Sequence, residues 1–206
     1  MDSLSLHLVG PSSLYEALCA VVDPRKTRGR RFRKIAGLLT LAAAAVLAGR
    51  RSYAAIAQWV RDVPQELLKA FGCIRGKDGK YAASSEPTLR RAISTVDGTE
   101  VDRVTCKWLR EQGISLKGNA IAIDGKTVRG SHGKDPQKQV ILVAALTHRE
   151  GVVIAQTKVE DKSNEIPAAR EMLLTLPLEG VLVTADAAHT QTETAELIIE
   201  KKGTTS

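Results

Sequence analysis

The sequence has 206 residues, of which 43% are hydrophobic, 3% aromatic and 26% charged. This length allows one large domain or two small ones, and the aliphatic content excludes a disordered, collagen-like or simple coiled-coil chain. The three cysteines, Cys19, Cys73 and Cys106, lie far apart and form no CxxC pair. We therefore expect a reducing compartment, with neither a disulfide framework nor a structural zinc site.

The excess of positive charge lies in one half of the chain. Residues 1–112 hold 19 of the 30 basic and 11 of the 23 acidic side chains, a net charge of +8, whereas residues 113–206 have a net charge of −1. This asymmetry favours an anionic partner for the first half alone. A basic surface that serves only solubility is the alternative that composition leaves open.

The pattern at the start of the chain does not resemble a secretory signal. Residues 1–10 have no basic segment, and the one long apolar run comes later, at 35–49. That run is shorter than the ~20 residues that cross a bilayer, so it favours a buried helix. We expect a cytoplasmic protein with no membrane partner.

The first half of the sequence predicts helices. Apolar side chains recur at helical spacing, and Ser, Pro and Gly stand where helices begin and end. A glycine-rich loop is expected at 72–83, and Gly113 is expected to end the last helix of this half. The predicted helices run from Ser12 or Ser13 to Val22, and over 35–49, 53–60, 63–71, 86–96 and 100–112.

The second half changes to the alternating and β-branched patterns of strands. Strands are predicted at 120–124, 140–147, 151–159 and 181–186, with a helix from Asn164 to Leu174 and a last helix capped by Thr190. The order β-β-β-α-β-α indicates a mixed α/β fold that follows an all-helical domain. We expect the helical domain at 10–112, a linker at 113–119 and the α/β domain at 120–206.

Two carboxylates stand at the ends of apolar strands. Asp124 follows 120–123, and Asp186 follows 181–185. Ligand sites of open α/β sheets lie at the carboxyl ends of strands, and two neighbouring carboxylates there can hold divalent ions. Hard oxygen ligands suit Mg²⁺ or Mn²⁺, which can activate water for phosphodiester cleavage. The alternative is that each Asp simply faces solvent where a strand meets a loop.

Cations follow the first of these carboxylates. The tripeptide Gly125–Thr127 is not a phosphate-binding P-loop, because Ala120 stands where that motif needs a glycine. Lys126 and Arg129 are candidates for contact with substrate phosphate, with ordinary surface cations as the alternative. His189, three residues after Asp186, is a weaker candidate for assisting at a metal site.

A basic segment precedes the apolar run. Residues 24–34 contain seven cations in eleven positions, with Phe32 as the only aromatic residue. Such a segment favours DNA phosphate contact and carries no signature of base recognition, although a solvated run remains an alternative. The candidate DNA-binding residues are Arg25, Lys26, Arg28, Arg30, Arg31, Arg33 and Lys34.

Six segments of the sequence, taken together, resemble the corresponding segments of bacterial insertion-sequence transposases of the DDE type, in the subgroup of H-repeat-associated proteins. The similarity runs in order from about residue 14 to the last residues. It rests on the combination of segments, since no single one is specific. The matching segments are Asp23–Phe32, Arg51–Ala57, Ser85–Arg91, AIDGKTVRG at 122–130, KSNEIPA at 162–168 and TADAAHTQ at 184–191.

The resemblance implies an N-terminal transposase-associated domain and an RNase H-like catalytic domain. In that fold the first strand and the strand after the first helix are adjacent, so Asp124 and Asp186 match the family's first two catalytic acids. The implied reaction is Mg²⁺-dependent (or Mn²⁺-dependent) hydrolysis and strand transfer at the ends of the element. The implied partners are DNA, a second copy or a full-length transposase, in a nucleoid-associated location.

One departure from the family changes the expected activity. The family's third acid is a Glu in a later helix, and no residue of this sequence matches it. We therefore expect an inactive, truncated copy that binds a metal weakly or not at all, with an unpaired sheet edge at 181–186. A non-catalytic DNA-binding fragment that regulates transposition is the main alternative. An unrelated metal-dependent nuclease would need a third ligand that the sequence does not supply.

Overall fold

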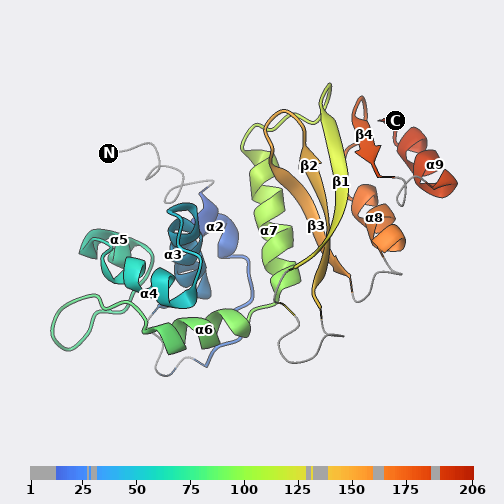
Figure 1. Ribbon diagram of the computed structural model, residues 1–206. Coiled ribbons are helices and arrows are strands. Elements are labelled where there is room, and N and C mark those ends of the chain that lie inside the picture. Colours follow the sequence, from blue (N-terminus) through green and yellow to red (C-terminus); the bar gives the residue numbers. More distant parts are fainter. Residues whose placement is uncertain are drawn as a thin grey trace. The chain divides into compact units, whose positions relative to one another are not determined.

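The chain forms two compact units in the computed structural model (Figure 1). The units are Met1–Thr105 and Cys106–Ser206, and the division falls inside the helix α7 (Gly98–Glu111). Leu116, in the segment expected to be a linker, is buried in the core of the second unit. The structure describes residues 13–26, 28, 32–128, 131, 139–159, 165–186 and 191–206.

The described part of the first unit is built of helices, as the sequence predicts. The first helix ends earlier than expected, at Leu18 instead of Val22, and the chain continues in tight turns. Ser13 is its N-cap, since the Ser13 hydroxyl accepts a hydrogen bond from the Glu16 amide. The helices are α2 (Leu14–Leu18), α3 (Ile35–Leu47), α4 (Tyr53–Arg61), α5 (Gln65–Ala70), α6 (Glu86–Ser94) and the start of α7.

Helix α3 is the centre of the first unit. Apart from Thr40, its residues are apolar on every face, which is the pattern of a helix enclosed by others. The helix contacts α2, α4 and α6. At Gly37 it passes so close to α5 that an added Cβ would lie 2.0 Å from the carbonyl oxygen of Phe71. The expectation of a buried helix in the apolar run is therefore confirmed, and α3, with 13 residues, is too short to span a bilayer.

The second unit contains a five-stranded mixed sheet. The strand order is β3-β2-β1-β4-β5, in which β1 to β3 pair antiparallel while β4 runs parallel to β1 and β5. The predicted α/β fold and the order β-β-β-α-β-α are confirmed. The elements are β1 (Ala120–Thr127), β2 (Ile141–Thr147), β3 (Val153–Val159), α8 (Glu165–Leu174), β4 (Leu182–Ala185), α9 (Thr192–Glu200) and β5 (Thr204–Thr205).

The short strand β5 corrects the expectation of an unpaired edge at 181–186. Lys202 adopts a left-handed conformation, with φ of 59°, and turns the chain back after α9. The Thr204 amide then donates to the Val181 carbonyl oxygen at 2.9 Å, and Leu182 and Val183 pair with Thr204 and Thr205. A strand of two threonines has no periodicity, so the sequence pattern does not reveal it.

The start of the last helix also differs from the prediction. Its N-cap residue is Gln191, which makes no side-chain capping bond, and the helix begins at Thr192. Thr190, the expected cap, and Asn164, the expected cap of α8, lie outside the described residues.

The sheet has two different faces. Ile121, Ile123 and Val143 are buried in a core that includes Leu173 of α8 and Ile198 of α9. Both helices lie on this side of the sheet (Figure 1). The alternate residues of β1 point to the opposite face, where their side chains are half-buried or exposed. Polar groups on that second face can therefore meet a ligand.

Candidate functional site

Asp124 and Asp186 occupy equivalent positions next to the pairing of two adjacent parallel strands, β1 and β4. The last paired residues of β1 and β4 are Ile123 and Ala185, and each Asp is the next residue along its strand. Neighbouring strands lie about 4.8 Å apart, so the backbones of these two residues are neighbours across β1 and β4. Both side chains are exposed. The sequence predicts that this strand ends at Asp124. In the structure β1 continues to Thr127, because β2 pairs with it as far as Ile141.

The acid pair lies on the polar face of the sheet. Side chains alternate along a strand, so Asp124 points away from the face on which Ile123 is buried. On β2 its cross-strand neighbour is Ala144, whose small side chain leaves the carboxylate accessible. The two predicted site residues are thus brought together, on a face that a phosphate or a cation can approach.

The chemistry of this pair suits a hard divalent cation. Carboxylate oxygens are the ligands that Mg²⁺ and Mn²⁺ prefer, and two carboxylates follow the last residues that pair between β1 and β4. Within the described ranges no three His, Cys, Asp or Glu side chains form a metal-binding group. His189 lies outside the described residues. The described residues thus supply two carboxylates here, those of Asp124 and Asp186.

Two lysines lie on the same face of the sheet as Asp124. Lys126 follows Asp124 by two residues, pairs with Leu142 of β2, and through it lies in one cross-strand row with Lys158 of β3. Both lysines are exposed. The sequence predicts Lys126 as a phosphate contact but not Lys158, because only the strand register reveals that Lys158 shares this row. Arg129 lies outside the described residues.

His148 adds a polar contact on the strand that carries Asp186. Its Nε2 lies 3.0 Å from the hydroxyl oxygen of Thr184, two residues before Asp186. The Thr184 hydroxyl itself donates to the Ile121 carbonyl oxygen at 3.3 Å. These contacts connect β4 to β1 through side chains as well as through the backbone. The sequence pattern gave no sign of this role.

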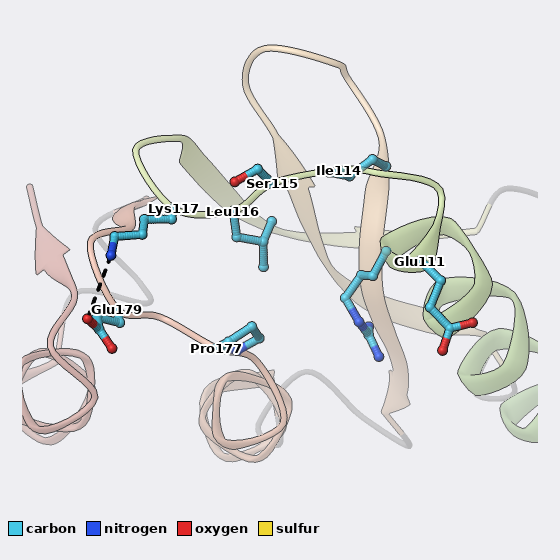
Figure 2. A pocket seen from close by; sticks show the side chains of 8 residues that line it. Glu111, Ile114, Ser115, Leu116, Lys117, Pro177 and Glu179 are labelled. Atoms are coloured by element: carbon cyan, nitrogen blue, oxygen red, sulfur yellow. Dashed lines mark ion pairs between the residues drawn. The ribbon is translucent and has the colours of Figure 1, made fainter.

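A pocket of the second unit lies away from the acids. It has a volume of about 470 Å³ and is lined by residues that precede β1 and β4, among them Leu116, Pro177 and Glu179. Figure 2 shows the ion pair between Lys117 and Glu179, 4.0 Å long, at one end of this pocket. Because it lies at the amino ends of the strands, it is not part of the acid site.

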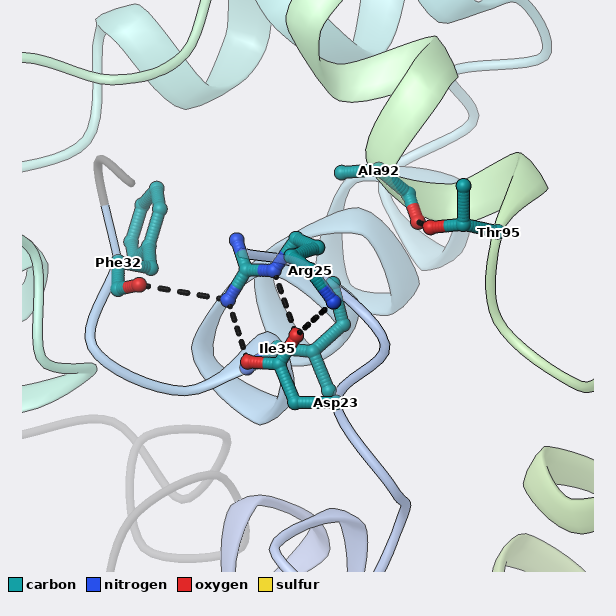
Figure 3. A network of polar contacts seen from close by, with 6 residues as sticks. All are labelled: Asp23, Arg25, Phe32, Ile35, Ala92 and Thr95. Atoms are coloured by element: carbon teal, nitrogen blue, oxygen red, sulfur yellow. Dashed lines mark hydrogen bonds and ion pairs between the residues drawn. The ribbon is translucent and has the colours of Figure 1, made fainter. Parts of the chain in front are cut away.

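In the basic segment, Arg25 makes internal contacts. Its Nε and Nη2 donate to the two carboxylate oxygens of Asp23, both at 2.8 Å, and Nη2 also reaches the Phe32 carbonyl oxygen at 3.3 Å (Figure 3). The Asp23 carboxylate also accepts from the Ile35 amide at the start of α3. Only 14% of the Arg25 side chain is exposed. The guanidinium therefore ties the segment to the first unit.

The remaining predicted DNA contacts divide into two groups. Lys26, Arg28, Arg33 and Lys34 have exposed side chains. Arg30 and Arg31 lie outside the described residues. A phosphate backbone can therefore approach four of the seven predicted cations.

Comparison with known proteins assigns both parts of the chain. Residues 15–109 match the family model described as DDE_Tnp_1-associated, and residues 115–205 match the one described as Transposase DDE domain. The chain is 34% identical over 191 residues to "Putative transposase YncI" of Escherichia coli O157:H7. The aligned residues cover 92% of this chain and 47% of that protein. The protein of the same name from strain K12 is also 34% identical, with 74% of its length covered.

These relatives are longer than this chain. It is 29% identical to "H repeat-associated putative transposase YhhI" of Escherichia coli K12, over 92% of this chain and 49% of that protein. The chain thus spans about half the length of several curated relatives. Among solved structures, the chain aligns with a piggyBac transposase synaptic complex with hairpin DNA, at 14% identity and a TM-score of 0.40. The alignment covers 94% of this chain and 47% of the piggyBac chain.

Proposed function

Because this chain belongs to the family of DDE transposases, we propose that Asp124 and Asp186 are the first two acids of a transposase catalytic centre. The observation that carries this proposal is their equivalent position, directly after Ile123 and Ala185, the last residues that pair between the parallel strands β1 and β4. The strand order and directions of the sheet agree with an RNase H-like domain. The substrate is DNA at the ends of an insertion sequence, and the reaction is phosphodiester cleavage and strand transfer.

The chemistry follows from the residues of the polar face. Asp124 and Asp186 would hold Mg²⁺ or Mn²⁺, which supplies activation of water and neutralises charge on the phosphate. The ammonium groups of Lys126 and Lys158 attract the DNA backbone to the same face. Their attraction to phosphate does not depend on base sequence, so these lysines position the DNA without selecting it.

The two parts of the chain are proposed to have different roles. We assign DNA contact to the helical domain at 10–112 and catalysis to 120–206, with 113–119 as the linker. Lys26, Arg28, Arg33 and Lys34 are the exposed cations of the helical domain that this assignment uses. Such a protein acts at the nucleoid in the bacterial cytoplasm, together with a second copy or a full-length transposase.

The 206 residues on their own are proposed to lack strand-transfer activity. The family's reaction uses three acids, and the matched motifs of this chain supply two. Two carboxylates hold a divalent ion weakly, and the reaction needs the third ligand. A chain that binds DNA without cleaving it would regulate transposition, which is the second candidate function and rests on the basic first half.

Metal binding tests the assignment of the acids. Binding of Mn²⁺ to the full chain, measured by electron paramagnetic resonance, is expected to weaken at least tenfold in Asp124→Asn and in Asp186→Asn. Glu179→Gln removes an exposed carboxylate near the amino ends of the strands and serves as the matched control. Equal Mn²⁺ affinity in all four proteins, with unchanged circular dichroism, would contradict the assignment.

A strand-transfer assay tests the proposed inactivity. The purified chain, with Mg²⁺ and DNA that carries the element ends, is expected to give no joined product. Mg²⁺-dependent strand transfer that disappears in Asp124→Ala would show instead that the 206 residues are an active enzyme.

A further inference from the structure

A small basic pocket lies in the first unit, and its lining includes neither of the two proposed catalytic acids. Its volume is about 230 Å³, and it is lined by Arg33, Lys69, Gly72, Cys73, Arg75 and Tyr81. Three of these six residues are cations, and the side chains of all three are exposed. They come from three different segments: the end of the basic segment, the last turn of α5 and the loop that follows α5.

Backbone contacts hold these segments together. Phe32 and Cys73 form an antiparallel bridge, and the Arg33 amide donates to the Gly72 carbonyl oxygen at 2.9 Å. A second bridge joins Arg75 to Tyr81. Because Phe32 and Cys73 are buried, the bridge between them is fixed to the core of the unit. The pocket is therefore part of the folded structure.

The charges around the pocket favour an anion. The described residues that line it include no Asp or Glu. Asp78, the acid of the adjacent turn, accepts a hydrogen bond from the Lys80 amide at 3.2 Å and is not part of the lining. Nε of Arg75 donates to the Gly79 carbonyl oxygen at 2.6 Å, which orients the guanidinium, and the same group has further N–H donors.

The size of the pocket favours a small group. Pockets for drug-sized ligands and cofactors measure about 300–1,000 Å³, which is larger than this one. Arg, Lys and Tyr side chains are typical donors to phosphate oxygens of DNA, and Arg can donate two parallel hydrogen bonds to one phosphate. Arg33 already belongs to the basic segment, which continues the positive charge beyond the pocket.

We propose that this pocket binds a backbone phosphate of DNA, with Lys69 and Arg75 as contacts that add to Arg33. The inference rests on the DNA-binding part of the proposed function and adds to it a defined binding site. It extends the DNA-binding surface from the basic segment to the end of α5 and to the following loop. One phosphate in the pocket would fix the position of the duplex on the first unit, without selecting its sequence.

The salt dependence of DNA binding tests this proposal. Binding of the full chain to a fluorescent duplex is measured by anisotropy at several salt concentrations, for Lys69→Gln, Arg75→Gln and the original sequence. Each lost phosphate contact lowers the slope of log K against log salt by about 0.9. Each variant is expected to bind about tenfold more weakly at low salt, as for the loss of a hydrogen bond to a charged group.

A matched control separates the pocket from net charge. Lys77→Gln removes one exposed cation from the same loop, outside the lining, and is expected to change the slope less than either pocket variant. Circular dichroism confirms that each variant folds. Lys69→Gln keeps the test decisive if Arg75→Gln disturbs its turn, since Lys69 lies on the surface of α5.

The possible results have different meanings. If the original chain binds no duplex even at low salt, the pocket proposal and the DNA-binding part of the proposed function both fail. If it binds and the pocket variants lose no more slope than Lys77→Gln, only the pocket proposal fails. It also fails if the pocket variants lose stabilisation by inorganic phosphate in thermal unfolding but keep full affinity for DNA. Tighter pocket-dependent binding to RNA of equal length would likewise overturn the choice of DNA.

Discussion

The guanidinium of Arg25 and the carboxylate of Asp23 form a two-pronged ion pair, with both N–O distances at 2.8 Å. The same carboxylate accepts the amide of Ile35, the first residue of α3. Side-chain exposures of 14% for Arg25 and 17% for Asp23 show that both groups are largely removed from water. The pair therefore connects the basic segment to the central helix of the first unit.

Replacing this carboxylate should destabilise the first unit. In Asp23→Asn the amide keeps one acceptor oxygen, so at least one N–H of Arg25 or Ile35 loses its partner. Hydrogen bonds to charged groups contribute about 1.5–3 kcal/mol, and we expect a loss of about 2–3 kcal/mol in the free energy of unfolding. Urea denaturation followed by Trp59 fluorescence, in a Trp108→Phe background, measures this unit.

Arg28→Gln is the control for this prediction. It removes an exposed cation of the same segment and should change the free energy of unfolding by less than about 0.5 kcal/mol. Equal stability of Asp23→Asn and Arg28→Gln would show that the ion pair contributes nothing to the fold.

Two glycine-to-alanine substitutions should have opposite effects. At Gly37 in α3 an added Cβ would lie 2.0 Å from the Phe71 carbonyl oxygen, so the backbone must move. We expect a loss of about 1–3 kcal/mol, the usual cost of overpacking, which outweighs the gain of about 1 kcal/mol in helix propensity. At Gly98, the first residue of α7, no atom lies within 4 Å of the added Cβ. Gly98→Ala should therefore stabilise by about 0.5–1 kcal/mol.

The same Trp59 measurement serves both variants, because both glycines belong to the first unit. Stabilisation by Gly37→Ala would mean that α3 and Phe71 are farther apart than the structure places them.

The sequence predicts the elements whose pattern is local. The length and apolar composition of the run at 35–49 identify α3, and the β-branched runs identify β2 and β3. The acid pair is also predictable, since Asp124 and Asp186 each follow a run of apolar residues in the sequence. The role of these acids in catalysis stays a prediction.

The missed features depend on contacts that the periodicity of the sequence does not reveal. Arg25 looks like any other cation of its segment until the fold brings Asp23, Phe32 and Ile35 around it. Lys158 shares a row with Lys126 only through the register of β2 and β3. In each case the sequence specifies the residue type, while the pairing depends on tertiary structure.

The contact between Glu150 and Asn119 should make stability depend on pH. The Asn119 side-chain amide donates to the Glu150 carboxylate at 2.8 Å, and this hydrogen bond lowers the pKa of Glu150 below its ordinary value of 4.5. A lowered pKa means that the unfolded chain takes up the proton first as the pH falls. The stabilisation is therefore complete above the ordinary pKa and is lost as the pH falls through the lower folded-state pKa.

Glu150→Gln measures this contribution. Urea denaturation should show the variant to be less stable than the original chain at pH 7, with the difference shrinking below the ordinary pKa of Glu150. The effect is small, because the carboxylate is exposed to water. A difference that grows as the pH falls would have the wrong sign and would contradict the contact.

The buried hydroxyl of Thr194 should be a source of instability. Thr194 lies in α9 with 4% of its surface exposed, and among the described residues its Oγ1 has no hydrogen-bond partner. A buried polar group without a partner costs about 1–3 kcal/mol. Thr194→Val replaces the hydroxyl with a methyl group of similar size and keeps the β-branched shape. We expect the second unit to become more stable by about 1 kcal/mol.

Thr40 provides the matched control, because it is also a buried helical threonine but its hydroxyl donates to the Ala36 carbonyl oxygen at 2.8 Å. Thr40→Val removes that hydrogen bond and should destabilise the first unit by about 1 kcal/mol. Trp108 fluorescence in a Trp59→Phe background reports on the second unit, and Trp59 fluorescence reports on the first. A loss of stability in Thr194→Val would show that its hydroxyl makes a stabilising contact, because the methyl group by itself adds buried apolar surface.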